Sequence, residues 1–89
     1  MNENIRESLC RMGLEDALVF DNPDYDPAII GYTDEGRVVY DFDKMVEHLA
    51  KTGQMSEIDA IEFIEYNTVR SLPYAGEKSP IIVYPIFIE

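Results

Sequence analysis

Apolar residues near the start of the chain recur at helical spacing. Ile5, Leu9 and Met12 are four and three positions apart, which places them on one stripe of a helix over residues 2–12. Gly13 follows, at the position where helices often end on a glycine in the left-handed conformation. The sequence therefore predicts a short amphipathic helix in this region.

A β-hairpin is the clearest pattern in the middle of the chain. Residues 28–33 are rich in Ile and Tyr, and residues 37–40 are mostly β-branched or aromatic. The Asp-Glu-Gly sequence between them predicts a tight turn with Gly36 at positive φ. Before the hairpin, two prolines make residues 21–27 a loop. Periodicity leaves open whether residues 17–20 form a buried strand or continue the helix.

A second helix follows the hairpin. Asp41 or Asp43 is expected to cap its N-terminus, because a short carboxylate accepts hydrogen bonds from free N–H groups in the first turn. Gly53 is expected to end it. Apolar side chains at i, i+3, i+4 and i+7 form a stripe that faces the core, namely Phe42, Met45, Val46 and Leu49.

A third helix opens at Ser56, with Asp59 three residues on as an imperfect capping box. It continues to about Val69 or Arg70. Leu72-Pro73 is expected to end it, because the residue before a proline disfavours helix. The side chains expected to face inward are Ile58, Ile61 and Ile64, with Ala60 beside them.

The chain closes with a polar loop over residues 74–80 and a strand over residues 81–88. Pro85 lacks an N–H group, so this strand is expected to lie at a sheet edge or to bend there. The elements together predict a single α+β domain over residues 1–89. Its sheet is small and mainly antiparallel, built from the hairpin and the C-terminal strand, with about three helices packed on one face.

The charge of the chain narrows the classes of partner. Its 89 residues include 18 acidic and 7 basic side chains, for a net charge of −11. Such a surface repels nucleic acid and anionic membranes, so we expect neither as a direct partner. A basic protein surface is the expected partner, and solubility alone is the alternative. A single core is barely sufficient at this length, which leaves a homodimer open.

The sequence carries no pattern for catalysis or a cofactor, and we expect neither. A nucleophile needs a base within reach. The one histidine, His48, lies off the apolar stripe of its helix, and the one cysteine, Cys10, lies beside the stripe of the first helix, so a pair between them is disfavoured. The lone cysteine, the lack of a long apolar run and a start unlike a signal peptide favour a cytoplasmic protein.

An acidic loop is the candidate cation site. Asp21, Asp24 and Asp26 cluster in it, and calcium binds clustered carboxylates. Read from position 22, the loop begins like an EF-hand. Pro27 then stands where that loop needs glycine, and Thr33 where it needs a bidentate glutamate. The alternative is Asx-turn chemistry, in which the carboxylates bind nearby backbone N–H groups.

An acidic ridge on the third helix is the first candidate binding surface. Asp59, Glu62 and Glu65 lie three apart on one side of the helix, and Glu47 of the second helix can extend the row. A row of carboxylates can imitate a phosphate backbone, although three over two turns are sparser than the charges of DNA. A solvated helix face is the alternative.

A cluster at the end of the same helix is the second candidate surface. It combines an arginine with side chains of the types enriched at binding hot spots. The alternative is that its arginine pairs with nearby acids while its amide bonds local backbone. The members of this cluster are Tyr66, Asn67, Arg70 and Tyr74.

Several segments resemble a known group of proteins. DYDPAIIG at 24–31, GRVVYD at 36–41 and YNTVRSLPY at 66–74, with Pro-Ile-Ile at 80–82, are similar to a family of small uncharacterised proteins from anaerobic Gram-positive bacteria and their mobile elements. The resemblance covers most of the chain after Phe20. It implies a bacterial or phage origin and no known activity. Phage-borne inhibitors of host nucleases, anti-CRISPR proteins among them, are also small and acidic, and the chain is analogous to them in size and charge.

Three functions are therefore weighed. The first is a non-enzymatic domain whose acidic surface binds a basic partner, such as a nucleic-acid-binding protein that it inhibits. The second is a calcium- or small-ligand-binding domain that uses the loop from Asp21 to Asp26. The third is a small enzyme whose pocket is lined by the helix-end cluster, or a homodimeric structural protein.

Overall fold

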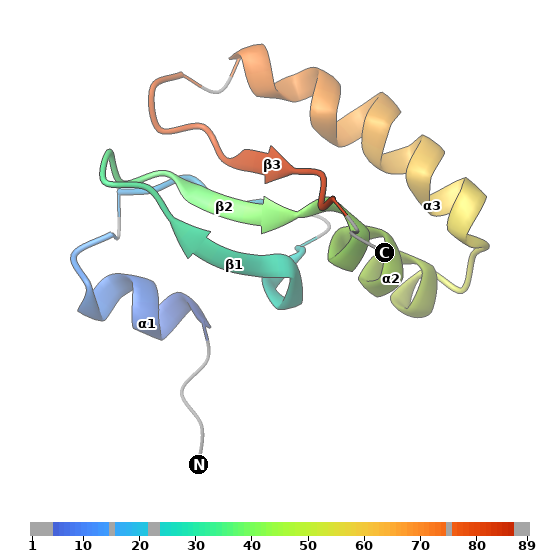
Figure 1. Cartoon of the computed structure of the whole chain (residues 1–89), viewed down its shortest axis with the longest axis horizontal. Helices are drawn as coiled ribbons and strands as arrows, with labels where there is room; N and C mark the ends of the chain where they lie inside the picture. Colours follow the sequence, from blue (N-terminus) through green and yellow to red (C-terminus); the bar gives the residue numbers. More distant parts are fainter. Residues whose placement is uncertain (1–4, 15, 22–23, 75, 87–89) are drawn as a thin grey trace.

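The sheet is built around its central strand β2 (Val38–Asp41). It pairs antiparallel with β1 (Ile29–Tyr32) and parallel with β3 (Ile81–Val83), as Figure 1 shows. This computed structural model describes residues 5–14, 16–21, 24–74 and 76–86. The fold is α+β, as predicted. The sheet is mixed rather than mainly antiparallel, because the chain returns through two helices before it enters β3, and such a crossover makes strands parallel.

The predicted hairpin is confirmed. Thr33 and Arg37 close it through a 2.8 Å backbone hydrogen bond, and the Gly36 N–H donates to the Thr33 carbonyl at 2.9 Å. Gly36 has φ +80°, the left-handed region that a residue without Cβ adopts freely. Tight-turn chemistry therefore fixes the β1–β2 register.

Helix α2 (Phe42–Thr52) begins directly at the end of β2. Asp41 is its cap, because the Asp41 carboxylate accepts from the Lys44 N–H at 3.1 Å. The predicted stripe of Phe42, Met45, Val46 and Leu49 is buried. Gly53 ends the helix as expected, but the left-handed residue is Gln54. A Cβ on Gly53 would lie 2.9 Å from the Leu49 carbonyl oxygen, so close approach rather than positive φ requires glycine there.

The third helical segment is longer and less regular than predicted. It runs as an α-helix, α3 (Glu57–Phe63), then as a π-turn, η2 (Ile64–Thr68), and then as a 3₁₀ segment, η3 (Val69–Tyr74). The prediction that Leu72-Pro73 ends it is wrong. The segment tightens to 3₁₀ turns, which are common at helix ends, and so accommodates a proline near its last residue.

The inward face of α3 also differs from the prediction. Ser56 caps the helix, since its hydroxyl accepts from the Asp59 N–H at 3.1 Å. Ala60 and Ile64 are fully buried, whereas Ile58 is 69% exposed, so its predicted inward position is wrong. Residues two positions apart lie about 200° apart around an α-helix. The same helix therefore cannot bury Ile58 together with Ala60.

The N-terminal third of the chain consists of one short helix and a long irregular segment that packs against the core. Helix α1 (Ile5–Arg11) buries Leu9, leaves Met12 about half exposed, and is followed by Gly13 at φ +80°. Residues 17–20 form neither the strand nor the helix that were left open. The chain has no regular structure there, and the Phe20 N–H donates to the Tyr40 hydroxyl at 3.0 Å. A short 3₁₀ turn, η1 (Asp26–Ala28), then leads into β1.

Strand β3 is shorter than predicted, at Ile81–Val83, and it lies at an edge of the sheet. Residues 84–86 continue beyond it without a ladder partner, and the Pro85 nitrogen cannot supply one. Positions 87 and 88 of the predicted strand lie outside the described residues. The predicted edge position of the strand is confirmed.

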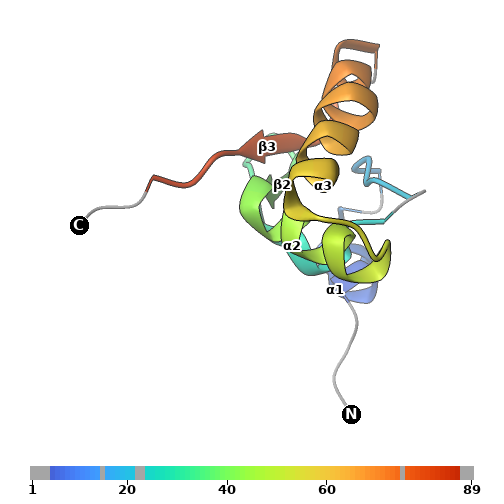
Figure 2. The ribbon, with the colours of Figure 1, turned by 90° about the vertical axis from the view of Figure 1, so that its right-hand side faces the viewer.

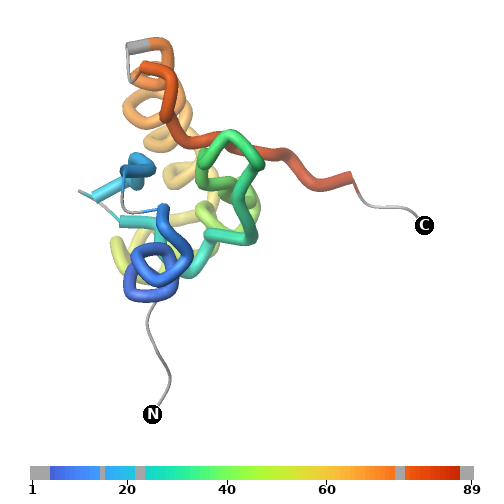
Figure 3. Tube along the Cα trace, turned by 90° about the vertical axis from the view of Figure 1, so that its left-hand side faces the viewer, coloured from blue at the N-terminus to red at the C-terminus, as the bar shows by residue number. Residues whose placement is uncertain are grey.

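In Figure 1 α3 runs above β3, α2 lies beyond the end of β2 and α1 lies below β1, and Figures 2 and 3 show residues 84–86 running out from β3 away from α1 and α3. Val38 and Tyr40 of β2 point into the core, and both are fully buried. In the part of the chain that is described, no helix has the length and apolar character needed to cross a membrane. The core consists of Leu9, Tyr25, Ala28, Val38, Tyr40, Phe42, Met45, Val46, Leu49, Ala60 and Ile64.

The buried Tyr40 hydroxyl should make stability fall in alkaline solution. Burial raises the pKa of Tyr40 to about 12, from about 10 in the unfolded chain. Because the folded state holds the proton more tightly, the stabilisation is complete below pH 10 and is lost as the pH rises from 10 to 12. That shift corresponds to roughly 2–3 kcal/mol. Urea denaturation across this range should show the loss.

Tyr40→Phe should weaken the fold at neutral pH through the lost hydrogen bond to Phe20, by about 1–3 kcal/mol. It should also flatten the alkaline loss. Tyr32→Phe is the matched control, since Tyr32 is 54% exposed, and it should keep the wild-type profile. An unchanged alkaline loss in Tyr40→Phe would contradict this role of the hydroxyl.

Candidate functional site

A shallow hollow on the exposed side of α3, η2 and η3 is the candidate site. Its volume is about 640 Å³. The structure therefore unites the acidic ridge and most of the helix-end cluster, which the sequence suggested as two separate surfaces. The hollow is lined by Asp59, Glu62, Phe63, Glu65, Tyr66, Asn67 and Arg70. We call this surface the α3 face.

Helical spacing explains how these residues meet. Successive contacts on one helix side fall three or four residues apart, and Asp59, Glu62, Tyr66 and Arg70 follow that rule. The π-turn at 64–68 widens the backbone in the middle of this row. Such turns occur often at functional sites.

The aromatic part of the α3 face is an arginine stacked on a tyrosine. The Arg70 guanidinium carbon lies 4.9 Å from the centre of the Tyr66 ring, and Tyr66 is 69% exposed. Among the described residues Arg70 makes no ion pair with an acid, so the alternative in which it neutralises the ridge does not hold there. The Asn67 amide donates to the Phe63 carbonyl at 3.1 Å, the local bond that was expected.

The three carboxylates of the face share their hollow with the Arg70 guanidinium but form no ion pair with it. Asp59, Glu62 and Glu65 are exposed, and none forms an ion pair with a described residue. Their neighbours on the same helix repel them at spacings of three and four. A cation brought by another molecule would relieve that repulsion.

A second hollow of about 290 Å³ lies on the inner flank of the π-turn. There the Tyr25 hydroxyl and the Thr68 hydroxyl share a buried hydrogen bond of 3.4 Å. Burial raises the pKa of Tyr25. Phe63 and Asn67 line both hollows, so the irregular turn separates a solvent-facing site from a contact that anchors the helix to the N-terminal segment.

Two predicted members are not part of the α3 face. Glu47 lies in a neighbouring groove of about 400 Å³ between α2 and α3, together with Asp43 and Glu57. Sequence reasoning missed the latter two, although Asp43 and Glu47 stand at i and i+4. Tyr74 is the last residue of η3. The predicted role of its side chain lies outside what the structure describes.

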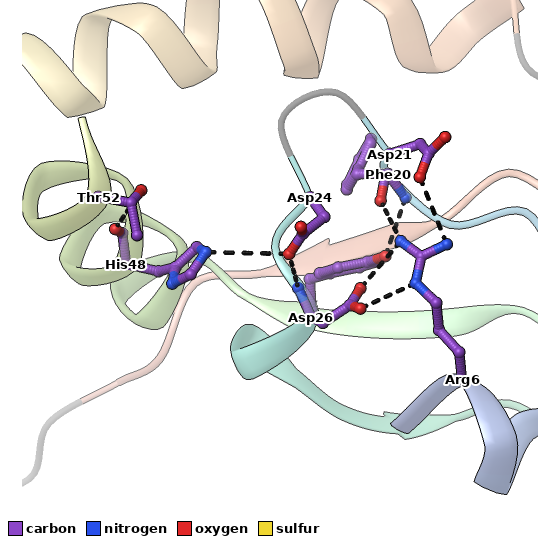
Figure 4. Close-up of polar contacts among 8 residues, drawn as sticks. Arg6, Phe20, Asp21, Asp24, Asp26, His48 and Thr52 are labelled. Carbon is purple, nitrogen blue, oxygen red and sulfur yellow. Dashed lines mark hydrogen bonds and ion pairs between the residues drawn. The ribbon is translucent and has the colours of Figure 1, made fainter. Parts of the chain in front are cut away.

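The acidic loop is arranged around Arg6 (Figure 4). The Arg6 guanidinium donates to both Asp26 carboxylate oxygens, at 2.8 and 3.1 Å, and to the Phe20 carbonyl at 2.9 Å. It also lies 3.5 Å from Asp21. The hydrogen bond that Arg6 donates to the Asp26 carboxylate raises the pKa of Arg6. We call this group the Arg6 clamp.

The geometry of the loop favours turn chemistry over a calcium site. Asp24 accepts from the Asp26 N–H at 3.3 Å and lies 3.9 Å from His48 Nε2. No three acidic, histidine or cysteine side chains converge as metal ligands in the described ranges. Two of the loop carboxylates instead face a guanidinium, which occupies the place a cation would need.

Cys10 and His48 line different hollows. Cys10 is exposed beside Arg6 and Leu14, and His48 lies on α2 with Lys44 and Lys51. The structure therefore does not place this thiol and this imidazole in one site.

Comparison of the chain with protein-family models, with curated proteins and with solved structures finds no match.

Loss of the Arg6 clamp should destabilise the fold. Arg6→Ala removes a bidentate ion pair and a hydrogen bond to Phe20, which are partly exposed, so we expect a cost of about 1–2 kcal/mol. Arg6→Lys should recover only part of it, because an ammonium cannot bind both Asp26 oxygens in plane. Urea denaturation measures the difference. An Arg6→Ala variant as stable as wild type would contradict a stabilising role for the Arg6 clamp.

Proposed function

We propose that the protein is a non-enzymatic binding protein that docks its α3 face onto a basic surface of another protein. One observation carries the proposal. Asp59, Glu62 and Glu65 share a hollow with a largely exposed Tyr66, and none of them forms an ion pair with a described residue.

The chemistry of the α3 face suits arginine and lysine side chains. Carboxylates accept charge-assisted hydrogen bonds from guanidinium and ammonium groups, which are stronger than neutral ones. Tyr66 offers an aromatic surface that packs on the apolar stem of such a side chain, and tyrosine is enriched at interface hot spots. The hollow thus combines charge for recognition with apolar area for affinity.

The wider acidic surface supports a partner that ordinarily binds nucleic acid. Asp43, Glu47 and Glu57 line a separate acidic groove between α2 and α3, on another side of α3. On α3 alone a charge recurs about every 4.5 Å of helix axis, against one per about 1.7 Å in double-stranded DNA. The α3 face is therefore sparser in charge than a phosphate backbone, and the net charge of −11 adds attraction at longer range. Occlusion of a basic groove is the inhibitory mode we propose.

An arginine-rich peptide labelled with a fluorophore is a direct probe of the α3 face. Binding measured by anisotropy should weaken steeply as NaCl rises, because salt screens the attraction. Glu62→Lys should weaken it about tenfold, equivalent to about 1.4 kcal/mol. Tyr66→Ala should weaken it without any change of charge.

Glu77→Lys is the charge-matched control, because Glu77 is exposed in the loop before β3, away from the α3 face. It changes the net charge by the same amount and should have a much smaller effect. Equal losses for Glu62→Lys and Glu77→Lys would mean that the peptide responds only to net charge. The proposed site would then be wrong.

A further inference from the structure

The hollow of the α3 face already holds one guanidinium, and that group belongs to the protein itself. The Arg70 guanidinium carbon is 4.9 Å from the centre of the Tyr66 ring. A cation attracts the face of an aromatic ring within about 6 Å. Tyr66 and Arg70 are four positions apart, so helical spacing brings the two side chains together. The Tyr66 ring therefore serves as a seat for an arginine side chain.

Arg70 uses only the aromatic part of this seat. Asp59, Glu62 and Glu65 line the same hollow, yet none of them forms an ion pair with Arg70. A guanidinium binds a carboxylate most strongly when two of its N–H groups meet both oxygens, and Arg70 makes no such contact within the described chain. The hollow thus keeps carboxylates that a second guanidinium can bind.

A guanidinium that arrives from another molecule can use both parts of the hollow. Glu62 lies four positions before Tyr66 on the row that faces the hollow, so a carboxylate and the ring are neighbours there. A guanidinium is planar and weakly hydrated, and it stacks on an aromatic ring while its edge donates to a carboxylate. The compact, strongly hydrated ammonium of lysine does this less well.

Arg70 opposes the entry of such a group in two ways. Its side chain covers a face of the Tyr66 ring, and its charge repels another cation brought into the same hollow. A partner arginine that displaces Arg70 from the ring removes the first obstacle. Arg70 then swings into solvent, which costs little because the stacked side chain is exposed.

We propose, on the basis of the function proposed above, that the α3 face selects arginine over lysine in its partner and that Arg70 is an internal competitor for the Tyr66 ring. Charge complementarity and the stacked guanidinium identify the occupant as an arginine side chain. Arg70 differs in one respect from the other residues of the hollow. Its removal should strengthen binding, whereas removal of Tyr66 or Glu62 should weaken it.

Two labelled peptides of equal length and charge test the selectivity. One carries arginines and the other carries lysines at the same positions, and fluorescence anisotropy measures their binding to the full chain. Wild type should bind the arginine peptide about threefold more tightly, the size of effect expected for a cation–π contact at an exposed site. Tyr66→Leu keeps an apolar side chain without the aromatic ring and should abolish this preference.

Arg70→Ala tests the competition. It should bind the arginine peptide about fivefold more tightly than wild type, because a competing stack and a like charge are both removed. Arg70→Gln, which keeps the length of the side chain, should show the same direction. Lys51→Ala is the charge-matched control, since Lys51 is exposed on α2 and lines a different hollow. Its gain should be much smaller, and circular dichroism checks that each variant is folded.

A double-mutant cycle separates the stack from the charge. The gain from Arg70→Ala should shrink when Tyr66 is already leucine, because no ring is left to compete for. Failure of wild type and both Arg70 variants to bind either peptide would overturn the proposed function and this inference together. Binding without a preference for arginine, or no gain in Arg70→Ala and Arg70→Gln, would overturn this inference alone. An equal gain in Lys51→Ala, or a gain that does not depend on Tyr66, would do the same.

Discussion

The contacts of a few basic side chains determine how this acidic chain folds and which carboxylates it leaves exposed. Seven basic side chains accompany 18 acidic ones, and three of the basic ones act as long-range hydrogen-bond donors. Arg6 holds Asp26 and the Phe20 carbonyl, Arg37 binds Ser79, and Lys78 donates to the Glu35 carbonyl. These three cations are engaged in contacts away from α3, and none of them pairs with a carboxylate of the α3 face.

The same ties position the α3 face. The Arg6 clamp and the hydrogen bond from Phe20 to Tyr40 fasten the irregular N-terminal segment to the central strand. The contact between Tyr25 and Thr68 fastens that segment to the π-turn of the third helix. That segment is thereby held against the core, and the acids of the α3 face point outward.

Local chemistry made much of the fold predictable, and long-range contacts account for the rest. The turn at Gly36, the Asp41 cap and the apolar stripe of α2 depend on neighbours in sequence, and all three were confirmed. The π-turn, the parallel pairing of β3 and the Arg6 clamp depend on residues far apart in sequence. Spacing could predict each half of the α3 face. Only the fold could show that the halves share one hollow, and that Phe63 helps to line it.

The dependence of stability on ionic strength tests the central claim most directly. Urea denaturation at increasing NaCl is suitable, because urea adds no ions of its own. If the surface acids lack counter-charges, screening relieves their repulsion, and the free energy of unfolding should rise from low salt to physiological ionic strength. If it falls instead, attractive ion pairs dominate the surface. The α3 face would then have no unbalanced charge to offer a basic partner.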